Sequence, residues 1–158
     1  MGHIRRTRVF NTPFETGLRS VVILTVAYPD SLGLNRLVVF DHLVVHTEDV
    51  GGPDSMHPKN RSRAAEILVR RGLVQSGLSL MQTRGFVERL VTPQGFRYRA
   101  GEASGLFVDT LSSDYMVALK ERADWLIAVI QPMSDGELAK LVQSRIDVWE
   151  PEFQAQGH

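Results

Sequence analysis

The stretch Thr83–Gly101, TRGFVERLVTPQGFRYRAG, decides the fold class. Its pattern predicts the end of a helix, a strand over Phe86–Val91 and a partner strand over Phe96–Arg99. Between the strands, TPQG places Pro93 at the second and Gly95 at the fourth position of a turn. That arrangement suits a type I turn in a four-residue hairpin loop. We therefore expect a β-hairpin directly after a helix, which is the position of the wing in a winged helix-turn-helix.

Alternation along the second predicted strand separates two kinds of side chain. Phe96 and Tyr98 fall on one face, and Arg97 and Arg99 fall on the other. Arginines on one face of a wing are ordinary phosphate ligands, so the hairpin is a candidate for contact with nucleic acid. A winged fold used as a protein-binding module is an equal alternative.

A buried helix is predicted near the start of the chain, at about residues 12–28. Thr12 is a suitable N-cap, Pro13 fits the first helical position, and Glu15 completes a capping-box pattern. The β-branched run that follows makes a strand possible, but the cap and the length favour a helix. The residues expected to face the core are Leu18, Val21, Val22, Thr25 and Val26.

Three further helices are predicted before the hairpin, over residues 35–46, 62–71 and 74–84. The first carries an apolar stripe, and Gly72 is expected to separate the second from the third. Helix, helix, turn, helix, hairpin is the order of a winged helix-turn-helix. The stripe of the first consists of Leu37, Phe40, Leu43 and Val44, and the inward residues of the third are Leu78 and Met81.

The last third of the chain is predicted to be helical. A short helix is expected over residues 102–111, a longer one capped by Asp114, and a last one begun by the capping box SDGE at residues 134–137. The inward residues of the longer helix are Met116, Leu119, Ala123, Ile127 and Ile130, and those of the last are Leu138, Leu141, Val142, Ile146 and Trp149.

These elements predict a mainly α fold with a small β-hairpin. We expect a single domain over residues 1–158, with a winged helix-turn-helix core at about 34–100. An added N-terminal helix at about 12–28 and C-terminal helices at about 102–153 flank that core. Because a core of this kind needs only about three helices and a hairpin, the C-terminal helices are expected to serve a further purpose. They complete the core around the first helix, present a surface to a partner, or do both. Ile146, Trp149 and Phe153 are the candidate partner-binding residues, since large side chains are favoured as interface anchors.

Charge is unevenly distributed along a chain whose formal net charge is zero. Residues 59–99 carry nine basic and two acidic side chains, whereas residues 100–158 carry four basic and ten acidic ones. A basic middle favours contact with nucleic acid or an acidic partner. The alternative is that the two segments pair with each other in the fold.

The candidate nucleic-acid ligands lie on the wing and on the helix before it. The helix over residues 74–84 offers glutamines and serines outward, with no Arg or Lys on that face before Arg84, so sequence-specific reading of bases is expected to be weak. The residues proposed are Arg84, Arg89, Arg97, Arg99, Gln75, Ser79 and Gln82.

Motifs of enzyme chemistry are absent from the sequence. It has no phosphate loop, no Gly-x-Ser-x-Gly and no His-Glu-x-x-His. His42 and His46 are spaced for one helical face, with Asp49 and His57 nearby, but the pair is expected to be the polar edge of a helix packed at an interface rather than a zinc site. We expect no catalytic residue, no metal and no cofactor. With no cysteine and no apolar run long enough to span a membrane, a cytoplasmic protein is expected.

Several blocks of the sequence together resemble one known family. They are FNTPFETGLRSVVILTVAYP, LNRLVVFDHLVVHTEDVGGPDSMHP, ILVRRGLVQSGLSLMQTRGFVER and YRAGEASGLFVDTLSS, followed by LKERADW. In order and spacing they resemble the middle component, family 2, of bacterial ABC-three-component systems. The resemblance runs from about Phe10 to Phe153.

The resemblance implies a small accessory protein that works with an SMC/Rad50-like ABC ATPase and a third system component. Such systems are proposed to act in conflict with phages or plasmids, and the family carries no assigned active-site residues. The leading hypothesis is a non-enzymatic adaptor in an antiviral defence complex. Contact with double-stranded DNA and formation of a homodimer stay open. The alternative is a winged-helix transcription regulator, and a metal-dependent enzyme using His42 and His46 is a third reading.

Overall fold

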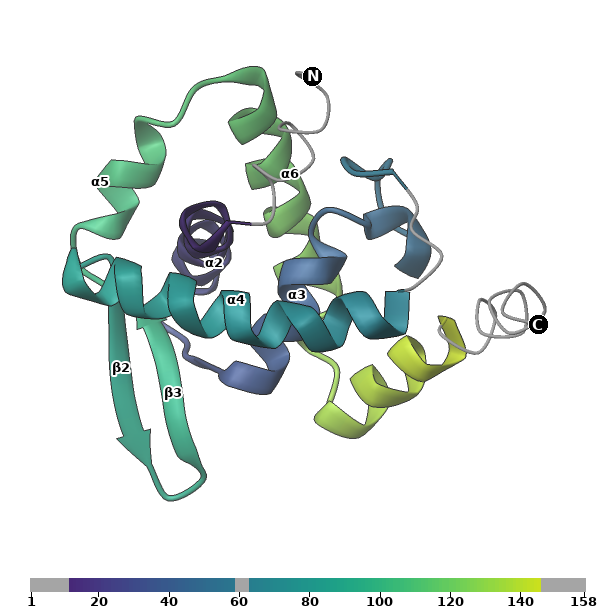
Figure 1. Cartoon of the computed structure of the whole chain (residues 1–158). Helices are drawn as coiled ribbons and strands as arrows, with labels where there is room; N and C mark the ends of the chain where they lie inside the picture. The colour runs from purple at the N-terminus through teal and green to yellow at the C-terminus, as the bar shows by residue number, and fades with distance from the viewer. Residues whose placement is uncertain (1–11, 59–62, 146–158) are drawn as a thin grey trace.

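A computed structural model of the chain describes residues 12–58 and 63–145, with the backbone alone described over 63–69. The described part is mainly helical, with one small antiparallel sheet (Figure 1). The elements are α2 (Pro13–Ala27), β1 (Leu32–Gly33), α3 (Leu34–Leu43), the 3-10 turn η1 (Thr47–Val50), α4 (Arg63–Thr83), β2 (Val87–Thr92), β3 (Gly95–Ala100), α5 (Ser104–Asp109), α6 (Asp114–Val129) and a further helix over residues 135–145.

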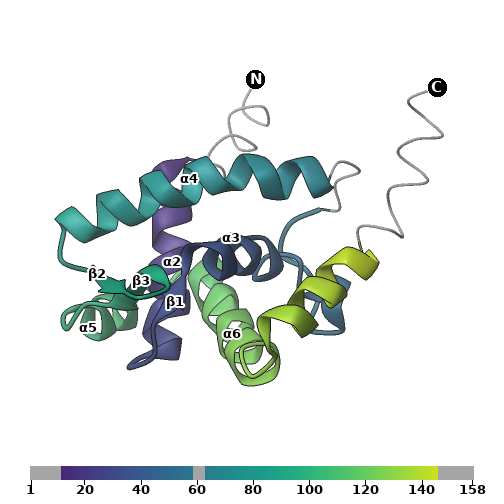
Figure 2. The same cartoon turned by 90° about the horizontal axis from the view of Figure 1, so that it is seen from below.

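Helix α2 is buried, as the sequence predicts, and it packs against α3, α4, α5, α6 and β3. The side chain of Thr12 accepts a hydrogen bond from the backbone N–H of Glu15 at 3.2 Å, and Pro13 occupies the first helical position. The four residues from Val21 to Leu24 are fully buried. Helix α4 crosses α2 near one end of α2, and α5 and α6 lie toward the opposite end (Figure 2). A helix that is buried on most of its surface must be covered on several sides, and the other helices provide that cover.

Helix α4 is continuous, so the predicted break at Gly72 is wrong. The two helices expected over residues 62–71 and 74–84 form a single helix of 21 residues. Gly72 is exposed within it, and a Cβ added there would meet no atom within 4 Å. A glycine inside a helix costs only about 1 kcal/mol relative to alanine. Packing of α4 against α2 and α3 outweighs that local preference.

Two glycines allow α2 and α4 to cross at very short range. A Cβ on Gly77 would lie 2.6 Å from the backbone N of Gly17 and 2.8 Å from its Cα. A Cβ on Gly17 would lie 2.7 Å from the carbonyl oxygen of Gly77. The two backbones therefore touch directly, and no other residue type fits at either position without moving a helix.

Helix α3 buries the predicted stripe but ends earlier than predicted. Leu37, Phe40, Leu43 and Val44 are all buried. The helix ends at Leu43 instead of continuing to residue 46, and the chain then forms the 3-10 turn η1. Residues 44–58 therefore form a folded connection and not the tight turn of a helix-turn-helix.

The hairpin is present, and a third strand joins it. The strand order is β1-β3-β2, with all neighbours antiparallel. Thr92 pairs with Gly95, so the loop has two residues and the predicted four-residue loop is wrong. Gly95 has a φ of +106°, which glycine adopts without strain. Strand β1 has only two residues, too few to produce an alternating pattern in the sequence.

The C-terminal helices begin close to the predicted positions. Ser113, not Asp114, caps α6, because its hydroxyl accepts from the backbone N–H of Met116 at 3.2 Å. The capping box predicted at SDGE is confirmed: Ser134 and Glu137 each bond the backbone N–H of the other, at 3.1 and 3.2 Å. Of the predicted inward residues, those buried are Met116, Leu119, Ala123, Ile130 and Leu138, while Ile127, Leu141 and Val142 are half-buried.

The predicted class, mainly α with a small β-hairpin, is therefore confirmed. The described residues share one buried apolar cluster that draws on every helix from α2 to α6. Within the described ranges, none of the helices combines the length and the apolar character needed to cross a membrane.

Candidate interaction surface

The free end of the hairpin exposes apolar side chains. Val91 and Phe96 pair across β2 and β3 and are 81% and 52% exposed. The guanidinium of Arg89 lies 4.4 Å from the centre of the Phe96 ring, in cation–π geometry. The hairpin projects from the helical body (Figure 1). We call Arg89, Val91 and Phe96 the hairpin tip, and its mixed apolar and cationic character suits contact with a protein.

The three wing arginines lie on two faces of the hairpin. Arg89 is paired with Tyr98 and therefore shares its face, while Arg97 and Arg99 lie on the opposite face. A nucleic-acid backbone that touched all three would have to reach both faces. The sequence places Arg97 and Arg99 together correctly, but the register that separates Arg89 from them becomes visible only in the sheet.

Arg97 and Arg99 make contacts within the protein. The Nε of Arg97 donates to the hydroxyl of Ser31 at 2.8 Å, and its Nη2 donates to the Ser31 carbonyl at 2.5 Å. The Nη2 of Arg99 donates to a carboxylate oxygen of Glu88 at 2.7 Å. The hydrogen bond and the charge of Glu88 raise the pKa of Arg99. Both arginines thus help to order the hairpin, and Arg99 is already neutralised.

The outer face of α4 carries the predicted polar residues together with one that the sequence prediction missed. Gln75, Ser79, Gln82 and Arg84 are exposed, as predicted. Because α4 continues through Gly72, Arg71 also lies on this face, one turn before Gln75. The i, i+4 spacing of Arg71 and Gln75 was readable in the sequence, but the assumed helix break concealed it.

A groove of about 1030 Å³ lies between the hairpin, the start of α3, the middle of α4 and the helix over residues 135–145. It draws Arg71 and Gln75 from α4, Phe96 and Arg97 from β3, and Leu138 from the last described helix. Ligand sites of proteins have volumes of about 300–1000 Å³, so the groove is large enough to hold a segment of another molecule. It brings together two of the predicted site residues, Gln75 and Arg97.

One wall of the groove is fixed by Arg36 of α3. Its guanidinium donates to the carbonyl oxygens of Gln131 and Met133, each at 3.0 Å, and to the Asp135 carboxylate at 2.6 Å. The three acceptors follow the end of α6 and lead into the helix over residues 135–145. This arginine therefore holds that helix against the start of α3.

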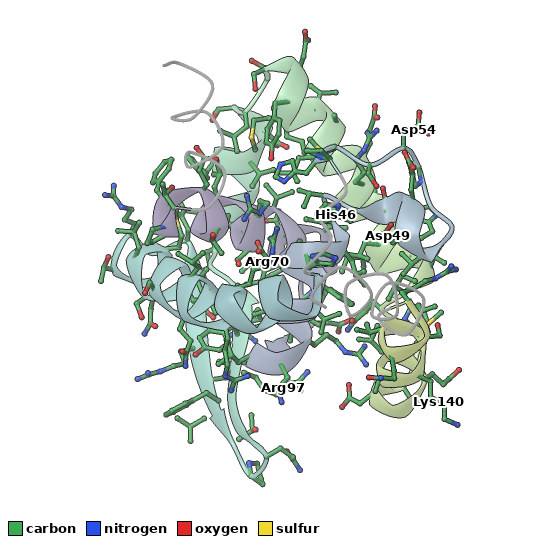
Figure 3. All side chains as sticks on the ribbon, turned by 45° about the vertical axis from the view of Figure 1, so that its right-hand side comes forward. His46, Asp49, Asp54, Arg70, Arg97 and Lys140 are labelled. Atoms are coloured by element: carbon green, nitrogen blue, oxygen red, sulfur yellow. The ribbon has the colours of Figure 1, made fainter. Side chains whose placement is uncertain are left out.

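A second polar group is buried under α4 and has a different character. Asp41 accepts hydrogen bonds from Arg19 Nε at 2.8 Å and from Arg70 Nη1 at 2.5 Å, and all three residues are at most 3% exposed. Arg70 extends from α4 into the interior (Figure 3). The carboxylate joins α2, α3 and α4, since each contributes one member. Charged residues of this kind are rarely fully buried unless paired, so the group is part of the core.

The histidine pair also lies in the interior. His42 and His46 are 1% and 2% exposed, with ring centres 4.5 Å apart. His57 Nε2 lies 3.1 Å from the hydroxyl of Tyr115. Burial, together with the nearby charge of Arg19, lowers the pKa of His57 to about 4. The part of the chain that the structure describes contains no group of three or more His, Asp or Glu placed to hold a metal ion.

The predicted partner-binding residues Ile146, Trp149 and Phe153 lie outside the described residues. The helix that leads to them is described as far as residue 145. Its apolar residues Leu138 and Val142 line the groove. The predicted apolar stripe of this helix, which includes Ile146 and Trp149 in the sequence, therefore has its first residue, Leu138, in the groove.

A comparison with protein families matches residues 9–152 to the family described as the ABC-three component (ABC-3C) system Middle Component 2. No curated protein matches the chain, and no solved structure matches it either. The match covers the hairpin, α4, the groove and the buried Asp41 group together.

Proposed function

Because the chain belongs to the ABC-3C system middle component 2 family, we propose that it is a non-enzymatic accessory subunit of such a system. In this proposal it links an SMC/Rad50-like ABC ATPase to the third component, within a complex that defends bacteria against phages or plasmids. Membership of a multi-component system supports a role in assembly. The defence role rests on the resemblance of the sequence to this kind of system.

We propose further that the body from α2 to β3 is a winged helix. Its order is helix, short strand, two helices and a hairpin, with β1 placed beside β3 in the sheet. That order supports the assignment, with α2 as the first helix of the core rather than as an added element. The long connection between α3 and α4 departs from a tight helix-turn-helix, which favours use of the fold as a protein-binding module.

The observation that carries the adaptor proposal is the hairpin tip. A wing that reads DNA presents several cations together to phosphate, yet Arg99 is paired with Glu88, and Arg89 lies on the opposite face from Arg97. The tip instead exposes Val91 and Phe96. Apolar and aromatic side chains are enriched at the centres of protein interfaces, where arginine is also favoured. A protein partner therefore fits the tip better than a duplex does.

Co-expression with the ABC ATPase and the third component tests this proposal. Val91→Asp places a charge in the proposed interface and is expected to reduce co-purification of the partner by at least tenfold. Leu106→Asp is the matched control, because Leu106 is also strongly exposed, at 77%, but lies on α5. Neither change touches the core. The adaptor role is rejected if the unmodified chain retains neither component.

A second contact is proposed for Trp149 and Phe153. They follow the last described helix, and large aromatic anchors contribute strongly to binding. Trp149→Ala with Phe153→Ala is expected to leave the circular dichroism spectrum unchanged and to weaken binding of the ATPase by at least ~2 kcal/mol. A double variant that unfolds would mean that these residues belong to the core, and one that binds normally would remove them from the interface.

Contact with the DNA backbone is proposed as an additional property. Arg84 and Arg89 are exposed on neighbouring elements, and residues 59–99 are strongly basic. These cations support weak, sequence-independent binding. A transcription regulator is the alternative, but the outer face of α4 carries mainly Gln and Ser, which read bases less strongly than arginine.

A further inference from the structure

The groove beside the hairpin contains two arginines whose charge is not matched by a carboxylate among the described residues. Arg71 donates to the side-chain oxygen of Asn35 at 2.5 Å, and Arg97 donates to the two oxygens of Ser31. These acceptors are neutral. Each guanidinium has five N–H groups, so hydrogen-bonding capacity remains at both. Arg71 is exposed and Arg97 is half-buried.

The other charges of the groove cancel. Arg36 and Asp135 both line it, and they form an ion pair at 2.6 Å. The groove therefore has a net charge of about +2, set by Arg71 and Arg97. A cationic groove favours an anionic occupant both in its rate of association and in its specificity.

The rest of the lining combines apolar side chains with neutral polar ones, among them Gln75, Gln94 and Gln131. Phe96, at the hairpin tip, is more than half exposed, and Tyr98 continues the same face toward the core. The apolar side chains of the lining are Leu34, Val39, Phe96, Tyr98, Leu138, Ala139 and Val142. An occupant that carries negative charge, apolar side chains and hydrogen-bonding groups, as an acidic peptide does, matches this lining.

We propose that this groove binds an acidic, extended segment of the ABC ATPase, with carboxylates on Arg71 and Arg97 and an apolar side chain between them. This inference rests on the proposed adaptor function and names the surface used. Bidentate Arg–carboxylate pairs combine strength with geometric specificity. The wall held by Arg36 makes the groove preformed, which reduces the entropy lost on binding.

A nucleic acid is the less favourable occupant. A single strand would place phosphates on the arginines, but its neighbouring sugars and bases would need stacking surfaces along the whole groove. Phe96 and Tyr98 provide aromatic rings at one side only, while Leu34, Val39 and Leu138 provide aliphatic surface. Aliphatic walls suit the side chains of a peptide.

Paired substitutions at one exposed position test the charge of the occupant. Ala139 lines the groove and is exposed, so longer side chains fit there without disturbing the core. Ala139→Glu is expected to weaken binding of the purified ATPase at least tenfold in isothermal titration. Ala139→Lys, which has similar length and opposite charge, is expected to bind within threefold of the unmodified chain.

Two further variants test whether ATPase binding depends on charge within the groove or on charge elsewhere on the protein. Arg71→Glu is expected to weaken binding at least tenfold. Lys140→Glu is the control. Lys140 is on the same helix as Ala139, over residues 135–145, but extends from its outer side, away from Arg97 (Figure 3). This variant is expected to bind the ATPase normally. Thermal unfolding of each variant verifies that the fold is retained.

The outcomes separate failure of the proposed groove contact from failure of the proposed adaptor function. Loss of binding in Ala139→Glu and Arg71→Glu alone supports the inference. Equal loss in Ala139→Lys, normal binding in Arg71→Glu, or displacement of the ATPase by a short single-stranded DNA would overturn it. If the unmodified chain binds neither the ATPase nor the third component, the adaptor function itself fails.

Discussion

Gly77→Ala should destabilise the protein although alanine is the better helix former. The added Cβ would lie 2.6 Å from the backbone N of Gly17, 2.8 Å from its Cα and 2.8 Å from the carbonyl oxygen of Pro13. All three atoms belong to the backbone of α2 or its first turn, so no flexible side chain can move aside. Relief requires that α2 and α4 move apart, and both helices contribute to the buried apolar cluster.

The magnitude follows from two opposing effects. Forcing an extra methyl into a packed core costs about 1–3 kcal/mol, and more where only backbone can yield. Replacing glycine by alanine inside a helix returns about 0.5–1 kcal/mol. We expect the free energy of unfolding to fall by about 2 kcal/mol. For a chain of this length that lowers Tm by about 4–8 °C.

Gly72→Ala on the same helix is the matched control. Its Cβ would meet nothing within 4 Å, so only the helix preference remains, and stability should rise by about 0.5–1 kcal/mol. Calorimetry and urea unfolding of both variants give the two changes directly. If Gly77→Ala stabilises the protein as much as Gly72→Ala does, the backbones of α2 and α4 do not touch at these glycines.

Three further predictions concern charge. Asp41→Ala leaves two buried arginines without their carboxylate and should cost about 3–5 kcal/mol of unfolding free energy, measured by urea unfolding, with Asp41→Asn costing less. The pKa of His57 is lowered from 6.5 to about 4, so the unfolded state binds the proton more readily. Stability should therefore fall as pH decreases from about 6.5 toward 4, by at most about 3 kcal/mol, and His57→Gln should remove that part of the pH dependence. Arg84→Ala with Arg89→Ala should flatten the salt dependence of duplex binding, by roughly 0.9 log unit of slope for each arginine that binds a phosphate, whereas Arg99→Ala should not; absence of duplex binding at low salt would end the DNA part of the proposal.

Local signals in the sequence were sufficient to predict the elements whose structure depends on one short segment. The cap at Thr12, the capping box at Ser134 and the two strands of the hairpin all depend on neighbours within a few residues. The apolar run Val21–Leu24 requires cover on several sides, and that requirement is visible without knowing which helices supply it.

Tertiary contacts decided the features that the sequence left hidden. Gly72 resembles a helix stop, but packing of the flanking turns against α2 carries the helix through it. Arg19, Asp41 and Arg70 are charged residues that a hydrophobic pattern assigns to the surface, yet they form one buried group. The groove is harder still to foresee, because it joins β3, α3, α4 and the last described helix, which are far apart in the sequence.

The distribution of charge gains a structural meaning from the pairs that form. In the basic segment over residues 59–99, Arg70 is paired with Asp41 and Arg99 with Glu88. In the acidic segment over residues 100–158, Asp135 is paired with Arg36. None of these three pairs joins the basic segment to the acidic one.

A neutral chain that keeps its two signs apart can present a different surface to each of two partners. Arg71, Arg84 and Arg89 are exposed on α4 and the hairpin. Among the described carboxylates of the last third, Glu121 and Asp124 on α6 and Glu137 in the segment after it are exposed. A subunit that links two proteins needs two separate surfaces, so that binding of one partner does not block binding of the other. Partial neutralisation of the acidic surface, for example by Asp124→Asn with Glu137→Gln, should therefore leave ATPase binding through the groove unchanged.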